Sequence, residues 1–304
     1  MRDLRLALGY EQINLWGGSY GTRLALTIMR DHPEGLRSVV LDSVYPPDVD
    51  LYLEAPANFE RSLNLLFDRC AANPVCDENY PDLGTTFFDT VERLNAHPIS
   101  SPITNTLTGQ AYTTTVRGDT LTGFVFQILY ETEFKYLLPQ IIHDASQDNF
   151  VAMNRVRGAL LSQLTVSSRG MMLSVQCNEE IPFSSLDEYE RMLARYPQFT
   201  GLYERSILGA LAYRICETWG SGQAPAIENQ PVSSDIPTLV LAGEFDPITP
   251  PAWSQHAAET LTNSFFYTYP GVGHGASAED CGRDMMLAFL ANPSVAPNDS
   301  CITQ

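Results

Sequence analysis

The pattern of apolar and polar residues divides the chain into two kinds of region. Residues 236–243 form a continuous apolar run, typical of a strand buried in a parallel sheet. Residues 13–16 are interpreted as the end of another buried strand, and residues 265–269 form a further strand-like run. An amphipathic helix is predicted over 22–29. Between residues 48 and 235 this alternation of strands and helices is lost.

Helical periodicity dominates that middle region. Predicted helices lie at 59–68, 85–94, 121–138 and 189–196. A stretch with Gly222, Pro225 and Pro231 follows and is typical of a linker back into the sheet. The pattern therefore predicts an α/β core interrupted by a helical insertion.

The pentapeptide Gly-Gly-Ser-Tyr-Gly at residues 17–21 lies between the first strand and its helix. This context is typical of a nucleophile elbow, in which a sharp turn strains the serine backbone and exposes its Oγ. We expect Gly17 and Gly21 to be glycine because strand and helix pass too closely there for side chains. Ser19 is thus the candidate nucleophile, and a glycine-rich turn with an idle serine is the alternative.

A serine nucleophile needs a general base. Four of the five histidines lie beside prolines or within helical patterns: His32, His97, His143 and His256. His274 instead lies in a glycine-rich loop, 271–275, after the strand-like run. Residues 277–280 resemble a capping box that opens the next helix. His274 is the predicted base, and an ordinary turn histidine is the alternative.

The acid that orients the base is expected at the carboxyl end of a parallel strand. Asp246 lies just after the apolar run 236–243, and a helix with proline near its first position follows. Glu244 is the rival, but it lies two residues earlier and could equally be a structural hydrogen-bond acceptor. Asp246 is therefore the predicted acid.

With these motifs the chain resembles the α/β-hydrolase exopeptidases related to prolyl and tripeptidyl aminopeptidases, including their TAP-like C-terminal segment. The resemblance is carried by Asn-Leu-Trp-Gly-Gly-Ser-Tyr-Gly-Thr-Arg at 14–23, Val-Val-Leu-Asp-Ser-Val at 39–44, Gly-Glu-Phe-Asp-Pro-Ile-Thr-Pro at 243–250 and Gly-His-Gly at 273–275. It extends to Cys301 and is loose over 100–165. It implies an α/β-hydrolase sheet with core segments 1–48 and 233–304 and a helical cap at 49–232.

The resemblance also implies that the N-terminal strands of the fold are missing, because the elbow of such enzymes normally follows four strands. The missing part would supply one oxyanion N–H, and the backbone N–H of Tyr20 would supply the other. We therefore expect this chain alone to have reduced activity and an exposed sheet edge, and a missing N-terminal segment is a possible partner.

Six cysteines allow several pairings. Cys70 and Cys76 flank a short turn that one bridge could close. Cys281 and Cys301 bracket the last helix and the tail, as in the TAP-like segment, and Cys177 and Cys216 remain in the middle region. Disulfides imply an oxidising compartment, hence a secreted, periplasmic or cell-envelope protein, and six buried free thiols are the alternative.

The composition excludes some classes of binding partner. A net charge of −18 argues against nucleic acid and anionic membranes, and no stretch is long and apolar enough to span a membrane. No metal-binding motif is present, and no cofactor is expected. The expected partners are peptide substrates with a free amino terminus.

Glu179 and Glu180 follow Cys177 in the cap. An exopeptidase must bind a free ammonium group, and a partly desolvated carboxylate is its natural counter-ion. The resemblance makes this acidic pair the candidate substrate-binding site, with a solvated acidic pair at a helix end as the alternative.

The function that follows is a serine aminopeptidase of the prolyl or tripeptidyl type, working through an acyl-enzyme. A carboxylic-ester hydrolase is the second hypothesis, since the same triad serves both reactions. An inactive truncated remnant is the third.

Overall fold

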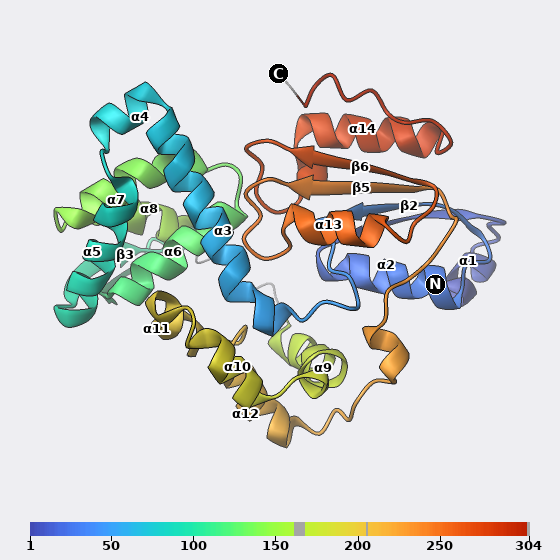
Figure 1. Cartoon of the computed structure of the whole chain (residues 1–304), viewed down its shortest axis with the longest axis horizontal. Coiled ribbons are helices and arrows are strands. Elements are labelled where there is room, and N and C mark those ends of the chain that lie inside the picture. Colours follow the sequence, from blue (N-terminus) through green and yellow to red (C-terminus); the bar gives the residue numbers. More distant parts are fainter. Residues whose placement is uncertain (161–167, 205, 303–304) are drawn as a thin grey trace. The chain divides into compact units, whose positions relative to one another are not determined.

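The computed structural model describes residues 1–160, 168–204 and 206–302. These form two compact units, one made of Met1–Asp50 with Ala224–Gln304 and the other of Leu51–Gln223 (Figure 1). The second boundary lies before the predicted residue 233. Residues 224–232 pack with the first unit because Arg30 Nη2 binds Glu228 Oε1 at 2.7 Å and Val232 is buried in that unit's core.

The first unit contains the sheet. Within the described residues four parallel strands follow the order β1-β2-β5-β6, namely β1 (Ile13–Gly18), β2 (Leu36–Asp42), β5 (Thr238–Gly243) and β6 (Ser264–Tyr269). Its helical elements are α1 (Arg2–Ala7), α2 (Tyr20–Asp31), η5 (Ala226–Asn229), α13 (Pro251–Ala258), η6 (Ala276–Ala278) and α14 (Asp280–Ala291). The parallel α/β core predicted from the apolar runs is confirmed.

Helices cover both faces of this sheet (Figure 1). Successive strand residues point to opposite faces, so Val39 and Leu41 of β2 join one core cluster while Val40 joins the other. The first cluster packs against α2 and α13, and the second packs against α14. Burial on both faces is the reason why β5 is apolar throughout, with every residue of its span buried.

The second unit is mainly helical. Its helices are α3 (Leu51–Ala72), α4 (Pro74–Asn79), α5 (Leu83–Ala96), α6 (Gly118–Tyr130), η1 (Lys135–Leu137), α7 (Leu138–Ser146), α8 (Val151–Leu160), α9 (Arg169–Glu179), η3 (Ile181–Phe183), α10 (Leu186–Leu193), η4 (Pro197–Phe199), α11 (Thr200–Glu204) and α12 (Ala210–Trp219). An antiparallel hairpin of β3 (Ile99–Thr104) and β4 (Ala111–Val116) was not predicted.

The single helix predicted over 121–138 is wrong. Helix α6 ends at Tyr130, and the chain then forms η1 and α7. Both helices contribute fully buried side chains, among them Leu129 and Ile142. Because both helices are buried, the apolar pattern continues across the break between α6 and α7.

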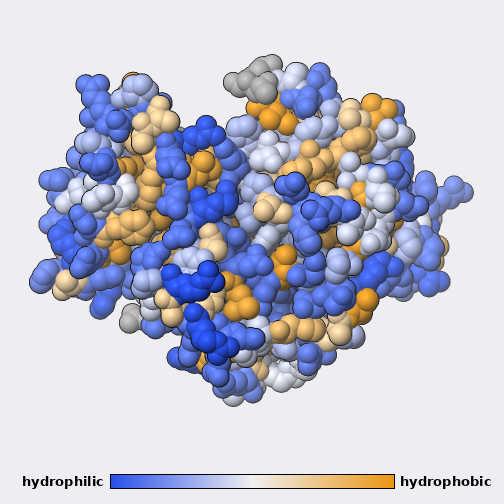
Figure 2. Space-filling view, in the orientation of Figure 1, coloured by the Kyte–Doolittle hydropathy of each residue, from blue (hydrophilic) through white to orange (hydrophobic). Residues whose placement is uncertain are grey.

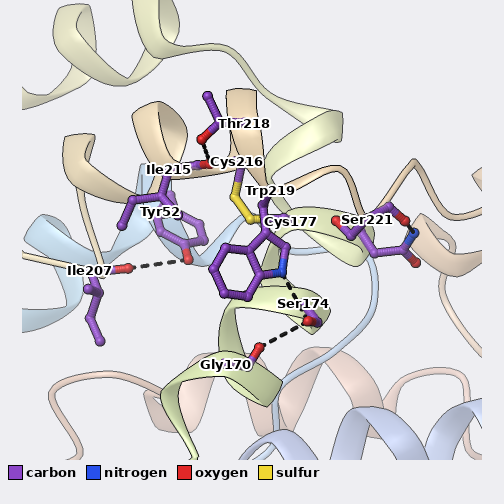
Figure 3. The surroundings of a disulfide bond; sticks show 11 residues. Tyr52, Gly170, Ser174, Cys177, Ile207, Ile215, Cys216, Thr218, Trp219 and Ser221 are labelled. Carbon is purple, nitrogen blue, oxygen red and sulfur yellow. Dashed lines mark hydrogen bonds between the residues drawn. A yellow bond between two sulfur atoms is a disulfide. The ribbon is translucent and has the colours of Figure 1, made fainter.

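The described part of the chain contains three disulfides, Cys70–Cys76, Cys177–Cys216 and Cys281–Cys301, the same pairs as the sequence suggests. Cys177–Cys216 joins α9 to α12 (Figure 3). Beside it Trp219 Nε1 donates to Ser174 Oγ at 3.0 Å, which fixes the same two helices to each other. Disulfides of this kind are typical of proteins in oxidising compartments.

Hydrophilic residues cover most of the face seen in Figure 2, with apolar residues between them. This agrees with the net charge of −18, which keeps a folded chain soluble. Among the described helices, none has the length and apolar character needed to cross a bilayer.

The two disulfides of the helical unit give a graded test. Cys177–Cys216 spans 39 residues and Cys70–Cys76 spans 6, so the first constrains the unfolded chain more. Replacing Cys177 and Cys216 by serine should lower the free energy of unfolding by about 4 kcal/mol, against roughly 2.5 kcal/mol for the Cys70/Cys76 pair. Guanidinium unfolding followed by circular dichroism measures both, and the reverse order of losses would contradict the argument from loop length.

Candidate active site

Ser19 occupies the sharp turn between β1 and α2. Its φ of 56° and ψ of −127° lie in a region that a non-glycine residue rarely adopts, as the elbow pattern predicts. Hydrogen bonds hold this conformation: the Ser19 N–H donates to the Asp42 carbonyl at 2.9 Å, and Thr22 Oγ1 donates to the Ser19 carbonyl at 2.6 Å. The strain is thus fixed by the neighbouring strand and the first turn of α2.

The two flanking glycines differ in their reason for being glycine. A Cβ at Gly17 would collide with the Gly21 carbonyl, so strand and helix do pass too closely at Gly17. A Cβ at Gly21 would meet nothing within 4 Å. The expectation for Gly21 is wrong: its carbonyl is the group that crowds Gly17, but a side chain added to Gly21 itself would point into open space.

His274 and Asp246 are brought together as predicted. His274 Nδ1 lies 2.7 Å from Asp246 Oδ2, and the side chains are 8% and 0% exposed respectively. Asp246 Oδ1 accepts the backbone N–H groups of Ile248 and Thr249, at 3.0 and 2.9 Å. The carboxylate is therefore held from one side by its own turn and from the other by the imidazole.

Two opposing effects act on the Asp246 carboxyl. Burial alone would raise its pKa, because a charged carboxylate is costly away from water. The charge and hydrogen bond of His274, together with the N–H groups of Thr249 and Ile248, outweigh burial and hold the pKa of Asp246 below its usual value. Asp246 is therefore an anion near neutral pH, as a residue that stabilises an imidazolium must be.

Thr249 belongs to this cluster although the sequence analysis did not single it out. Its Oγ1 donates to Asp246 Oδ2 at 2.7 Å and lies 3.1 Å from His274 Nδ1. In the sequence, the only indication of this role is the position of Thr249 three residues after Asp246.

Glu244, the rival acid, has a structural contact. Its Oε2 accepts the backbone N–H of Gly271 at 2.8 Å, and its own N–H donates to the Tyr269 carbonyl at 3.0 Å. It therefore holds the loop that leads to His274. The imidazole of His274 is hydrogen-bonded to the carboxylate of Asp246.

The described residues 277–280 do not form the expected capping box. Residues Ala276–Ala278 form the short helix η6, and α14 begins at Asp280 with Glu279 as its N-cap and no side-chain cap bond. The Ser277 backbone N–H donates to Asp42 Oδ2 at 2.8 Å. The serine is thus engaged with β2 rather than with the first turn of α14.

The remaining candidates divide between the units. Tyr20 is the first residue of α2, where the helix dipole is positive. Glu179 is the last residue of α9 in the helical unit, and Glu180, 6% exposed, is its C-cap. Among the described residues no cluster of three or more His, Cys, Asp or Glu side chains could hold a metal ion.

The chain was compared with known proteins. Residues 207–301 match the family model described as TAP-like protein. The chain is similar to "Serine protease Hip1" of Mycobacterium tuberculosis (strain H37Rv) and of Mycobacterium bovis, at 24% identity over 97% of this chain and 58% of each relative. The chain therefore spans little more than half the length of these curated relatives.

A solved structure of MGS-M2, an alpha/beta hydrolase enzyme from a Medee basin deep-sea metagenome library, is 18% identical, with a TM-score of 0.40 over 96% of this chain and 69% of that chain. Parallel strands with helices on both faces, and an elbow serine after β1, are the features of an α/β-hydrolase fold. The chain has this fold.

The buried Asp246 should make stability depend on pH. Its pKa is depressed in the folded state, so its contribution is present above the unfolded value of 3.8 and is lost as the pH falls through the lower folded value. The free energy of unfolding should therefore fall in acid for the parent protein, while the deficit of Asp246→Asn, large at pH 7, should shrink towards pH 2. Urea titrations from pH 2 to 7 measure this.

The exposed Asp68→Asn controls for the loss of one negative charge. A deficit of Asp246→Asn that stays constant with pH would contradict the depressed pKa.

Proposed function

We propose that this protein is a serine hydrolase acting through Ser19, His274 and Asp246. The observation that carries the proposal is the buried hydrogen bond of 2.7 Å between Asp246 and His274 Nδ1. It leaves Nε2 as the nitrogen that would act on a serine hydroxyl. Support also comes from the strained elbow of Ser19, which lies at the carboxyl ends of the parallel strands, as do the other two residues.

The reaction follows from these roles. Ser19 Oγ attacks the carbonyl carbon while His274 Nε2 takes the serine proton, and Asp246 stabilises the imidazolium without taking the proton itself. The Tyr20 N–H donates to the oxyanion of the tetrahedral intermediate. His274 then protonates the leaving group, and water releases the acyl group by the same steps in reverse.

For the substrate we infer peptides cleaved from a free amino terminus, as aminopeptidases of the prolyl or tripeptidyl type do. The match to the TAP-like model and the similarity to proteins named as serine proteases support peptides as the class. Glu179 and Glu180 are the proposed counter-ions of the substrate ammonium group. Hydrolysis of carboxylic esters by the same residues is the alternative.

The proposed location is outside the cytoplasm, in the secreted, periplasmic or cell-envelope fraction. Three disulfides in the described residues support it, since thiols stay reduced in most cytosolic proteins.

A fluorophosphonate probe tests the nucleophile. It should label Ser19 in the parent protein, and Ser19→Ala should abolish labelling because it removes the proposed nucleophile. Asp246→Asn should slow labelling by about 10⁴-fold, since the imidazole loses its orienting anion. The matched Glu244→Gln, two residues away, should stay near the parent rate, because its amide oxygen can still accept the Gly271 N–H. Intact-mass analysis and peptide mapping measure all three variants.

Labelling of another serine in Ser19→Ala would refute the nucleophile. A larger loss in Glu244→Gln than in Asp246→Asn would reverse the choice of acid.

Paired substrates test the amino-terminus requirement. A chromogenic peptide anilide with a free amine should be cleaved, whereas its N-acetylated form should not. Glu179→Gln or Glu180→Gln should raise KM for the free amine by about 10- to 100-fold, the value of one charged hydrogen bond, with kcat almost unchanged. Hydrolysis of a p-nitrophenyl ester controls for the chemistry. Equal cleavage of both anilides would refute the amino-terminus requirement, and cleavage of the ester alone would favour the ester-hydrolase alternative.

A further inference from the structure

Asp42, the last residue of β2, and Ser43, which follows it, are hydrogen-bonded to the elbow on one side and to β5 on the other. Asp42, 1% exposed, accepts the Ser19 N–H on its backbone carbonyl at 2.9 Å. The next N–H along the chain, that of Ser43, donates to the Leu241 carbonyl of β5 at 2.9 Å. The backbone of this dipeptide is thus bonded to both of the strands that flank β2.

The side chains of the same dipeptide hold the loop that follows His274. Gly275 N–H donates to Ser43 Oγ at 2.9 Å. Ala276 N–H and Ser277 N–H donate to Asp42 Oδ1 and Oδ2, at 2.9 and 2.8 Å. Three consecutive backbone N–H groups directly after His274 are therefore bound by these two side chains.

The conformation of Ser43 suits this arrangement. Its φ is 57°, and it is fully buried, although serine has none of the freedom of glycine at positive φ. Such a conformation persists where surrounding contacts determine it. Here it lets one strand end direct two adjacent side chains at one loop.

The charge of Asp42 is part of the same arrangement. Burial raises the pKa of its carboxyl, and the bonds from Ser277 and Ala276 and the charge of His274 oppose that effect. The carboxylate therefore depends on this loop for its hydrogen bonds, and the loop depends on the carboxylate.

We propose that Asp42 and Ser43 are positioning residues that fix His274 relative to Ser19. The Asp42 carbonyl sets the backbone of the nucleophile, and the two side chains set the loop of the base. This inference rests on the proposed function, in which His274 activates Ser19. It adds that both settings come from one dipeptide, so that the same two residues fix the backbone of the nucleophile and the loop of the base.

Three variants test the proposal. Asp42→Asn keeps the shape but replaces one acceptor oxygen by an N–H donor, and Ser43→Gly removes the hydroxyl while tolerating positive φ. Ser38→Ala is the matched control, because Ser38 is also buried in β2 and binds Asn14 of β1 at 2.7 Å, away from the His274 loop. All three lose one polar contact of the same strand.

The first measurement needs no activity. Hydrogen exchange at the amides of residues 275–277 should become at least about 10-fold faster in Asp42→Asn and Ser43→Gly, and should stay unchanged in Ser38→Ala. The second measurement is the rate of fluorophosphonate labelling at Ser19. It should fall about 10- to 100-fold in the first two variants, the effect of a misplaced base, and stay near the parent rate in the control.

The outcomes separate the two claims. Faster exchange with unchanged labelling would overturn the positioning role, as would an equal loss of labelling in Ser38→Ala. Unchanged exchange in Ser43→Gly, which is expected to fold even where Asp42→Asn does not, would overturn the claim that these two side chains hold the loop. Absence of labelling in the parent protein would refute the proposed function, and the exchange result would then decide whether Asp42 and Ser43 hold the loop.

Discussion

The parallel direction of β1, β2, β5 and β6 is the constraint on which the candidate site depends. Strands that run the same way end at the same edge of the sheet, so the segments that follow them meet there. Ser19, Asp42 and Asp246 each come directly after or at the end of such a strand, and His274 comes from the loop after the fourth. Residues far apart in the sequence thereby reach one edge of the sheet, where hydrogen bonds such as that between His274 and Asp246 can form.

Asp42 and Asp246 are both buried, but they bind different hydrogen-bond donors. Asp246 is surrounded by donors from its own turn and by an imidazole, so its negative charge is stabilised by hydrogen bonds from both sides. Asp42 accepts backbone N–H groups from a neighbouring loop, and its role is to hold that loop. Each carboxylate is satisfied by hydrogen bonds before any substrate arrives, which is the condition for keeping a buried charge at modest cost.

The sequence predicted the features that depend on local pattern. The strained serine, the buried strand before Asp246 and the parallel core follow from glycine spacing and apolar runs. It failed where tertiary contacts decide. Two buried helices share one continuous apolar pattern up to and beyond Tyr130, and Ser277 binds a distant aspartate instead of capping its own helix. Asp42 also lies at the carboxyl end of a parallel strand, as the argument for Asp246 requires. The neighbouring sequence does not indicate that its partners are the N–H groups of residues 276 and 277.

The helical unit interrupts the sheet between two neighbouring strands, and this affects how the chain can fold. Strands β2 and β5 pair directly, with Val39 opposite Thr238, yet Leu51–Gln223 lie between them in the chain. During synthesis β1, β2 and α2 emerge long before β5 exists, while the helical unit is one continuous segment of the chain. The interrupting unit can complete its core first, and the sheet closes last, at the high contact order that slows folding.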